Sequence, residues 1–148
     1  MLSSIHNLRE ITRLCLMGEQ LDHELSCWLG TSLLEFLERR CLTIDKAFGL
    51  EFPRGGIPWW MEEAIRKRDT ALRQLAERHF AGHSLSARSR EIRILSCRYA
   101  ATAWRHDRRY GEMPERYAGT PNEHLWQAFQ SGAAMPLSER QLRNILIC

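Results

Sequence analysis

Arginine side chains dominate the middle of the chain. The stretch 88–109 holds seven arginines but only two acidic residues, Glu91 and Asp107. If 84–110 is one helix, with about 100° between successive residues, its apolar residues gather on one side and several arginines align on another. An arginine fork without an acidic neighbour is suited to contacting phosphate oxygens. The candidate nucleic-acid-binding residues in this stretch are Arg90, Arg98, Arg105, Arg108 and Arg109.

The net charge of +3 is the sum of opposed segments. Residues 1–65 hold six Lys/Arg and ten Asp/Glu (−4), residues 66–116 hold thirteen and six (+7), and residues 117–148 hold two of each (zero). The positive excess favours a nucleic acid, DNA or RNA, as the partner. The acidic segment supports an alternative, because it can pair with the arginines within one chain or across a homodimer.

Two adjacent tryptophans, Trp59 and Trp60, follow a Gly-Gly-Ile-Pro loop. Exposed aromatic side chains near a turn are typical anchors of protein interfaces. They therefore support a second interpretation, a protein-binding adaptor or inhibitor that docks a partner through its bipolar charge and these two residues. Packing of both rings into a core at the start of a helix is the competing interpretation.

The segment from Arg73 to His79 resembles the R-x(4–6)-H element of HEPN-type ribonucleases, which are helical and often dimeric. The resemblance implies that Arg73 and His79 form a catalytic pair for phosphodiester cleavage. Gln74 stands where the family usually has Asn, Asp or His. This is a remote alternative, and we expect a non-enzymatic protein.

Two pairs of residues have the i,i+4 spacing of helical metal ligands: His23 with Cys27, and His79 with His83. Together they could form a tetrahedral zinc site. Such pairs also arise by chance in a helical chain, so we expect neither a metal nor another cofactor.

The elements that must position these residues are all expected to be helices. Apolar residues recur at three-to-four spacing, and in the first helix they are Ile5, Leu8, Ile11, Leu14 and Cys15. Ser, Thr, Pro and Gly stand at the expected helix boundaries, among them Pro58 in the first turn of a helix and Ser138, which forms a capping box with Gln141 at the start of the last one. Ser32-Leu33-Leu34-Glu35 predicts a capping box that opens a helix through about Ala47, with Leu33, Phe36, Leu37, Cys41 and Ile44 inward. The predicted order is acidic helices in 4–47, a loop over 48–57, a basic antiparallel hairpin over 58–110 and a C-terminal hairpin over 120–147.

The C-terminal pair of helices also has the outline of a helix–turn–helix motif. The residues of its last helix that would read bases are Arg140, Gln141, Arg143 and Asn144. The turn that precedes them is longer than usual for this motif, so we expect a plain helical hairpin.

Length and composition favour one all-α domain over 1–148, a bundle of about five to six helices. A chain of 148 residues can bury a sizeable core without a disulfide or a metal. Five widely spaced cysteines, no apolar run of membrane-spanning length and no secretory signal predict a cytoplasmic protein with no membrane partner. We expect a small nucleic-acid-associated protein, a regulator or a subunit of a nucleoprotein complex.

Overall fold

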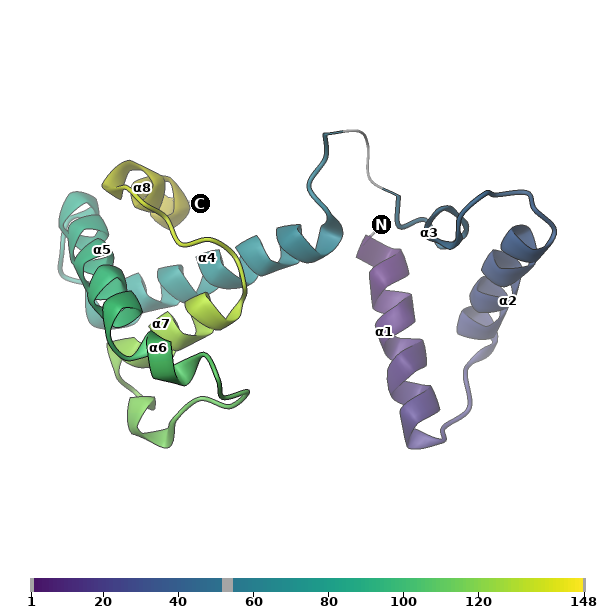
Figure 1. The fold of residues 1–148 in the computed structure, drawn as a ribbon, viewed down its shortest axis with the longest axis horizontal. Helices are drawn as coiled ribbons and strands as arrows, with labels where there is room; N and C mark the ends of the chain where they lie inside the picture. Colours follow the sequence, from purple (N-terminus) through teal and green to yellow (C-terminus); the bar gives the residue numbers. More distant parts are fainter. Residues whose placement is uncertain (1, 52–54, 148) are drawn as a thin grey trace. The chain divides into compact units, whose positions relative to one another are not determined.

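Helices make up the regular structure of the chain (Figure 1). The structure, a computed structural model, describes residues 2–51 and 55–147, and in these ranges it contains no strand. The all-α prediction is therefore confirmed for the described residues, none of whose helices is long and apolar enough to cross a membrane. The elements are α1 (Leu2–Met17), α2 (His23–Leu37), α3 (Ile44–Ala47), α4 (Trp59–His79), α5 (Leu85–Ala101), α6 (Trp104–Asp107), the 3-10 helix η1 (Glu115–Tyr117), α7 (Pro121–Gln130) and α8 (Glu139–Ile147).

Internal contacts divide the chain into two compact units, Met1–Trp59 and Trp60–Cys148, which we call unit 1 and unit 2. The expectation that 1–148 forms one domain stays a prediction, as does the antiparallel arrangement of the two hairpins. The described residues form more helices than the five or six predicted, because two predicted helices are interrupted, at 38–43 and at 102–103.

In unit 1, α1 buries Ile5, Ile11 and Leu14 of its predicted stripe, whereas Cys15 is exposed. The helix ends at Gly18, whose φ of 70° is a conformation that glycine adopts without strain. The next helix, α2, begins one residue after Asp22, whose carboxylate accepts a 2.8 Å hydrogen bond from the Leu25 amide. This cap satisfies a free amide of the first turn.

The capping box predicted at Ser32 is wrong. Ser32 is buried in the middle of α2, because Asp22 already starts the helix ten residues earlier. The helix also stops at Leu37 instead of continuing to Ala47. Arg39 has a φ of 59°, which ends helical geometry, and Thr43 then caps the four-residue α3.

This interruption changes which side chains face inward in unit 1. Of the residues predicted to be buried, Leu33, Leu37 and Ile44 are exposed, with Leu37 at 73%. Cys41 is buried as predicted, and it packs with Ala47 and Phe48 in one small cluster. A second small cluster contains Ile11, Leu14 and Leu25. Trp28 and Leu29 pack against both clusters and join them.

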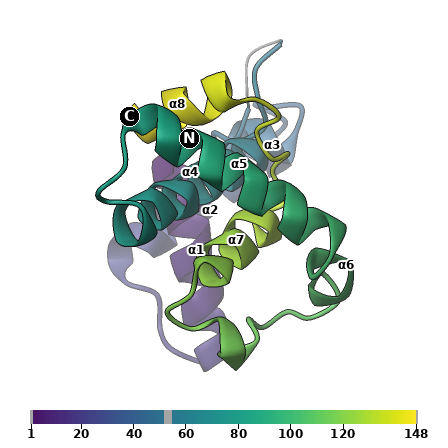
Figure 2. The same cartoon turned by 90° about the vertical axis from the view of Figure 1, so that its left-hand side faces the viewer.

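Unit 2 has one larger core. Its helix α4 starts directly after Pro58, as predicted, and buries Leu72, Leu75 and Ala76. Figure 2 looks onto α5, with α8 on one side of it and α7 on the other. The core draws residues from four helices and η1: Ala71, Leu72, Leu75, Ala76, Ile92, Tyr99, Tyr117, Leu125, Ala128 and Leu142.

The last two helices, α7 and α8, both lie within the segment 120–147 in which two helices were predicted. Pro121 occupies the first turn of α7, where its missing amide costs nothing. At the start of α8, the Ser138 hydroxyl accepts from the Gln141 amide at 3.2 Å, and the Gln141 side chain accepts from the Ser138 amide at 3.2 Å. This reciprocal pair is the predicted capping box. The helix packs along α5 and buries Leu142.

Candidate nucleic-acid interface

The predicted helix over 84–110 is two helices. Its start is confirmed, because the Ser84 hydroxyl accepts a hydrogen bond from the Ala87 amide and caps α5. Its predicted end is wrong, since α5 stops at Ala101 and Thr102 has φ −116° and ψ −93°. The Thr102 hydroxyl donates to the Arg98 carbonyl at 2.7 Å, and the chain resumes as the short helix α6.

A buried carboxyl group accounts for the break between α5 and α6. Asp107 is 2% exposed, and its Oδ2 accepts hydrogen bonds from the hydroxyls of Tyr99 at 2.8 Å and Tyr117 at 2.7 Å. In a continuous helix, residues 99 and 107 would be separated by about 12 Å along the axis, too far for this bond. The change of direction at Thr102 brings the carboxyl group back onto Tyr99.

The Asp107 cluster is held by burial and by one exposed cation. Burial, together with the hydrogen bond to Asp107, raises the pKa of Tyr99, so its hydroxyl stays a donor. Arg116 lies 3.7 Å from Asp107 Oδ1, and its guanidinium sits 5.0 Å from the centre of the Tyr117 ring. This cluster fixes the position of α6 relative to α5 and η1.

Four of the five predicted phosphate contacts are exposed around this break. Arg98 lies in the last turn of α5, Arg105 lies on α6, and Arg108 and Arg109 lie on the turn that follows. In the described part of the chain, none of the four side chains has a hydrogen bond or an ion pair. The break replaces the predicted straight stripe with cations on two helix segments.

The other arginines of this stretch have partners. Arg90 is exposed, but its Nε lies 3.8 Å from Glu91. Arg88 donates to the carbonyls of Ala81 at 2.6 Å and His83 at 3.0 Å, so it holds the loop before α5. Arg93 lies 3.9 Å from Glu139 on α8. The cations without a partner are therefore concentrated at the carboxyl end of α5 and beyond it.

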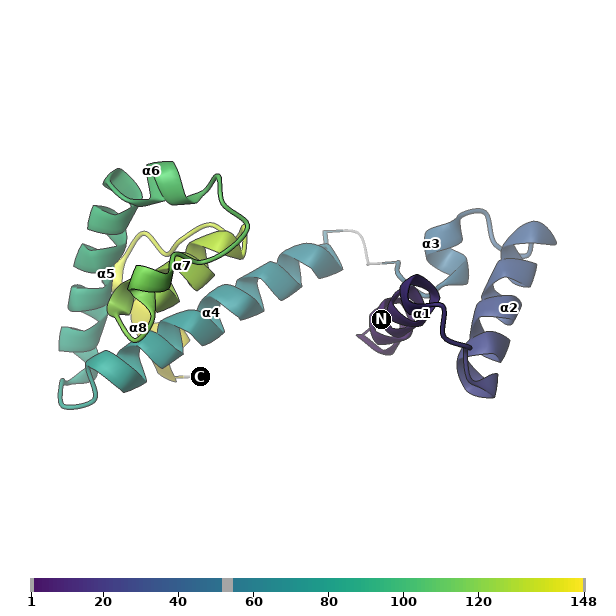
Figure 3. The same cartoon turned by 90° about the horizontal axis from the view of Figure 1, so that it is seen from below.

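A cavity of about 460 Å³ is lined by residues that neighbour these arginines in the sequence. Figure 3 shows α6 at the end of α5 and the following segment returning toward α7. The break also leaves His106 exposed on α6. The lining residues are His106, Asp107, Tyr110, Glu112, Pro114 and Arg116.

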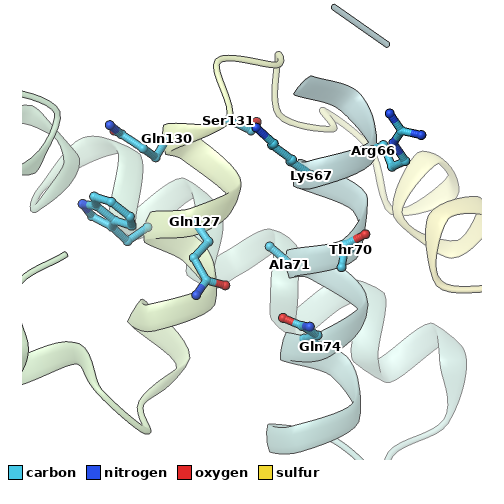
Figure 4. Close-up of a pocket in the computed structure, with 9 residues that line it drawn as sticks. Arg66, Lys67, Thr70, Ala71, Gln74, Gln127, Gln130 and Ser131 are labelled. Carbon is cyan, nitrogen blue, oxygen red and sulfur yellow. The ribbon is translucent and has the colours of Figure 1, made fainter. Parts of the chain in front are cut away.

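A second cavity, also of about 460 Å³, lies between α4 and α7 (Figure 4). In this view the Lys67 side chain extends toward Ser131, and Gln127 lies between the two helices. Lys67 is paired with Glu63 at 3.1 Å, so only part of its charge is available to a ligand. Sequence reasoning missed the glutamines here, although the three-residue spacing of Gln127 and Gln130 could have placed both on one helical face.

The two tryptophans proposed as partner anchors differ. Trp60 is 54% exposed, whereas Trp59 is half-buried. A third tryptophan, Trp104, packs against the core of unit 2, with its ring centre 5.3 Å from that of Phe129. Trp60 is thus the more accessible of the two predicted anchors.

The residues of the alternative sites belong to different units or contact other residues. His23 lies 3.6 Å from Cys27 in unit 1, whereas the His79 ring packs on His124 in unit 2. Among the described residues, no three His, Cys, Asp or Glu side chains form a group that could hold a metal ion. Arg73 donates to the carbonyl of Ile145 at 3.3 Å and to Thr70 at 3.4 Å, so its guanidinium helps to hold α8.

Known proteins give no further guide to this site. Comparisons of the chain with family models, with curated proteins and with solved structures find no match.

Proposed function

We propose that the protein is a small, non-enzymatic nucleic-acid-associated protein, a regulator or a subunit of a nucleoprotein complex. It contacts phosphates through Arg98, Arg105, Arg108 and Arg109. The observation that carries the proposal is that all four side chains are exposed and make no hydrogen bond or ion pair with the described residues. Guanidinium groups in this state form charge-assisted bonds to phosphate oxygens without first breaking an internal pair.

Binding through these arginines depends steeply on salt. Each neutralised phosphate contributes a slope of about −0.9 to the logarithm of the binding constant against the logarithm of salt concentration, so four contacts give about −3.6 on duplex DNA. The net charge of unit 2 also favours binding to a polyanion, because residues 60–148 hold fifteen Lys/Arg and ten Asp/Glu, a net +5.

The test is fluorescence anisotropy with labelled single-stranded and duplex oligonucleotides from 50 to 200 mM salt. The wild-type protein should bind with the steep slope, and reversal of all four arginines to Glu should abolish binding. A matched variant reverses four other exposed basic residues, Arg39, Arg40, Lys46 and Arg78, and so changes net charge equally. It should retain most of the binding. No binding by the wild-type protein, or equal loss in both variants, would overturn the proposal.

One observation favours a second candidate, protein docking through Trp60. This ring is half exposed and lies next to the exposed Met61, an apolar pair of the type found at interface centres. The opposed net charges of residues 1–59 and 60–148, −2 and +5, favour a second copy of the chain as the partner. Sedimentation analysis should then show a dimer for the wild-type protein and a monomer for Trp60→Ala, and a wild-type monomer at high concentration removes this candidate.

A further inference from the structure

The cavity lined by His106, Asp107, Tyr110, Glu112, Pro114 and Arg116 is suited to a ligand more specific than a phosphate chain. We propose that it takes one unstacked base of a single-stranded nucleic acid, a base that carries an amino group, with guanine the best fit. Tyr110 stacks on the base, and the carboxyl group of Glu112 accepts its hydrogen bonds. This inference rests on the proposed function, because the neighbouring arginines hold the phosphates on either side.

The first support is the way cations and lining residues alternate along the chain. His106, Asp107 and Tyr110 line the cavity, whereas Arg105, Arg108 and Arg109 are exposed between and beside them. Residues on one turn of helix lie about 5–6 Å apart at their Cβ atoms, comparable to the spacing of a phosphate and its base. One short segment therefore presents both phosphate-binding and base-binding groups.

The second support is an aromatic side chain without a partner. Tyr110 is 61% exposed, and no aromatic ring in the described part of the chain stacks on it. The other tyrosines of this unit, Tyr99 and Tyr117, are buried and donate to Asp107. An exposed ring at the rim of a cavity is what base stacking needs, and any base can stack on it.

The third support is acceptor capacity inside the cavity. Asp107 also lines the cavity, but it is buried and already engaged by the hydroxyls of Tyr99 and Tyr117 and by Arg116 at 3.7 Å, so the accessible acceptor is Glu112. Glu112 is exposed and has no ion pair among the described residues. Carboxyl oxygens accept only from donors, so they favour guanine, whose N1–H and 2-amino group are adjacent donors, over uracil, whose single N3–H lies between two carbonyl oxygens.

The cavity is also of suitable size for one base. Its volume of about 460 Å³ falls within the range of about 300–1,000 Å³ that is typical of small-molecule sites. A base inside a duplex must leave the stack before it can enter such a site, which costs free energy. We therefore expect single strands to bind more tightly than duplexes of the same length.

The experiment compares four labelled 12-mers by anisotropy at one salt concentration. Three are oligouridine strands whose central residue is guanosine, inosine or uridine, and the fourth is the guanosine strand in a duplex. Inosine lacks only the 2-amino group of guanosine. The guanosine strand should bind about ten-fold more tightly than the uridine strand, with inosine between them, and the duplex should bind more weakly than the guanosine strand.

Three variants then separate the base site from the phosphate contacts. Tyr110→Ala should weaken binding of the guanosine strand about ten-fold and leave the duplex unchanged, whereas Tyr110→Phe, which keeps the ring, should bind like the wild type. Glu112→Gln should reduce only the difference between guanosine and inosine. Arg105→Glu should weaken all four oligonucleotides alike.

The two proposals fail in different ways. If the wild-type protein binds none of the oligonucleotides, the proposed function fails, and the base site fails with it. If it binds all four equally and Tyr110→Ala changes nothing, phosphate binding stands and the base site is overturned.

Discussion

The core side chains of unit 1 and unit 2 differ in how completely they are buried. In unit 2, Leu72, Leu75, Ile92 and Leu125 are fully inaccessible, whereas the most buried residues of unit 1 remain 6–9% exposed. Unit 1 also exposes large apolar side chains, such as Leu16, Leu37 and Leu42. A smaller body buries a smaller fraction of its surface, and the 59 residues of unit 1 have two small clusters in place of one core.

The difference extends to charge. Residues 1–59 hold six Lys/Arg and eight Asp/Glu, a net −2, against +5 in unit 2. The better-packed unit 2 also contains Arg98, Arg105, Arg108 and Arg109 and the buried Asp107 cluster. A site that must hold several groups in fixed positions needs a rigid support, and unit 2 supplies one.

The largest expected effect on the free energy of unfolding comes from a cavity-creating substitution in the core of each unit. Leu72→Ala in unit 2 should lower the free energy of unfolding by about 3–5 kcal/mol, because a fully enclosed site cannot collapse. Leu14→Ala in unit 1 should cost about 2 kcal/mol, since partly exposed surroundings relax more easily. Urea unfolding followed by circular dichroism measures both. Equal losses would show that the difference in burial has no energetic meaning.

The next effect tests the Asp107 cluster. Tyr117→Phe removes one hydroxyl that donates to the buried Asp107, and it should cost about 1–2 kcal/mol of unfolding free energy. Tyr110→Phe removes an exposed hydroxyl and serves as the control, with a change below about 0.5 kcal/mol. If both variants unfold at the same urea concentration, the cluster does not stabilise unit 2.

A smaller effect concerns pH and His124 on α7. This ring is 1% exposed, neither ring nitrogen has a hydrogen-bond partner among the described residues, and burial lowers its pKa. Below its ordinary value of about 6.5 the unfolded chain then binds the proton more readily than the folded one, so stability falls as the pH decreases. The slope cannot exceed about 1.4 kcal/mol per pH unit for one proton.

Thermal unfolding between pH 7.5 and pH 5 measures this effect. His124→Leu should flatten the decline, whereas His23→Gln, which changes an exposed histidine of unit 1, should leave it unchanged. A decline that survives in His124→Leu must come from other groups.

The smallest expected losses of unfolding free energy come from removing one helix N-cap side chain in each unit. Asp22→Ala removes the 2.8 Å bond to Leu25, and Ser84→Ala removes the 3.3 Å bond to Ala87. Each should cost about 1 kcal/mol, with the greater loss at Asp22 because a carboxylate also interacts with the helix dipole. Urea midpoints of the two variants, measured together, decide the order, and a greater loss at Ser84 would contradict it.

Sequence patterns predicted the helices whose boundaries are decided locally. The buried stripe of α1, the start of α4 after Pro58 and the capping box at Ser138 depend only on neighbouring residues, and all three are present. The break at Thr102 depends instead on a hydrogen bond from Tyr117, which lies outside the predicted helix. Helical periodicity contains no information about such a partner, so it extended the helix to 110.

The candidate site was predictable in part for the same reason. Counting charges along the sequence identified the arginines that lack acidic neighbours. Four of them are exposed without a partner in the described structure. Counting charges could not show that Arg88 holds a loop or that Asp107 turns inward, because both depend on backbone carbonyls or hydroxyls brought close by folding. The exposed ring of Tyr110 became apparent only once the helix was seen to end early.

The bonds that close the Asp107 cluster also bear on the order of folding. They join residues eight and ten positions apart, whereas the contact of Arg73 with α8 spans seventy-two. A loop of about ten residues closes in about 10–100 ns, and non-local pairs form later because they must overcome a larger loss of chain entropy. We expect the bend at Thr102 to form before α8 docks, so that the segment 98–117 takes its shape while much of the chain is still unfolded.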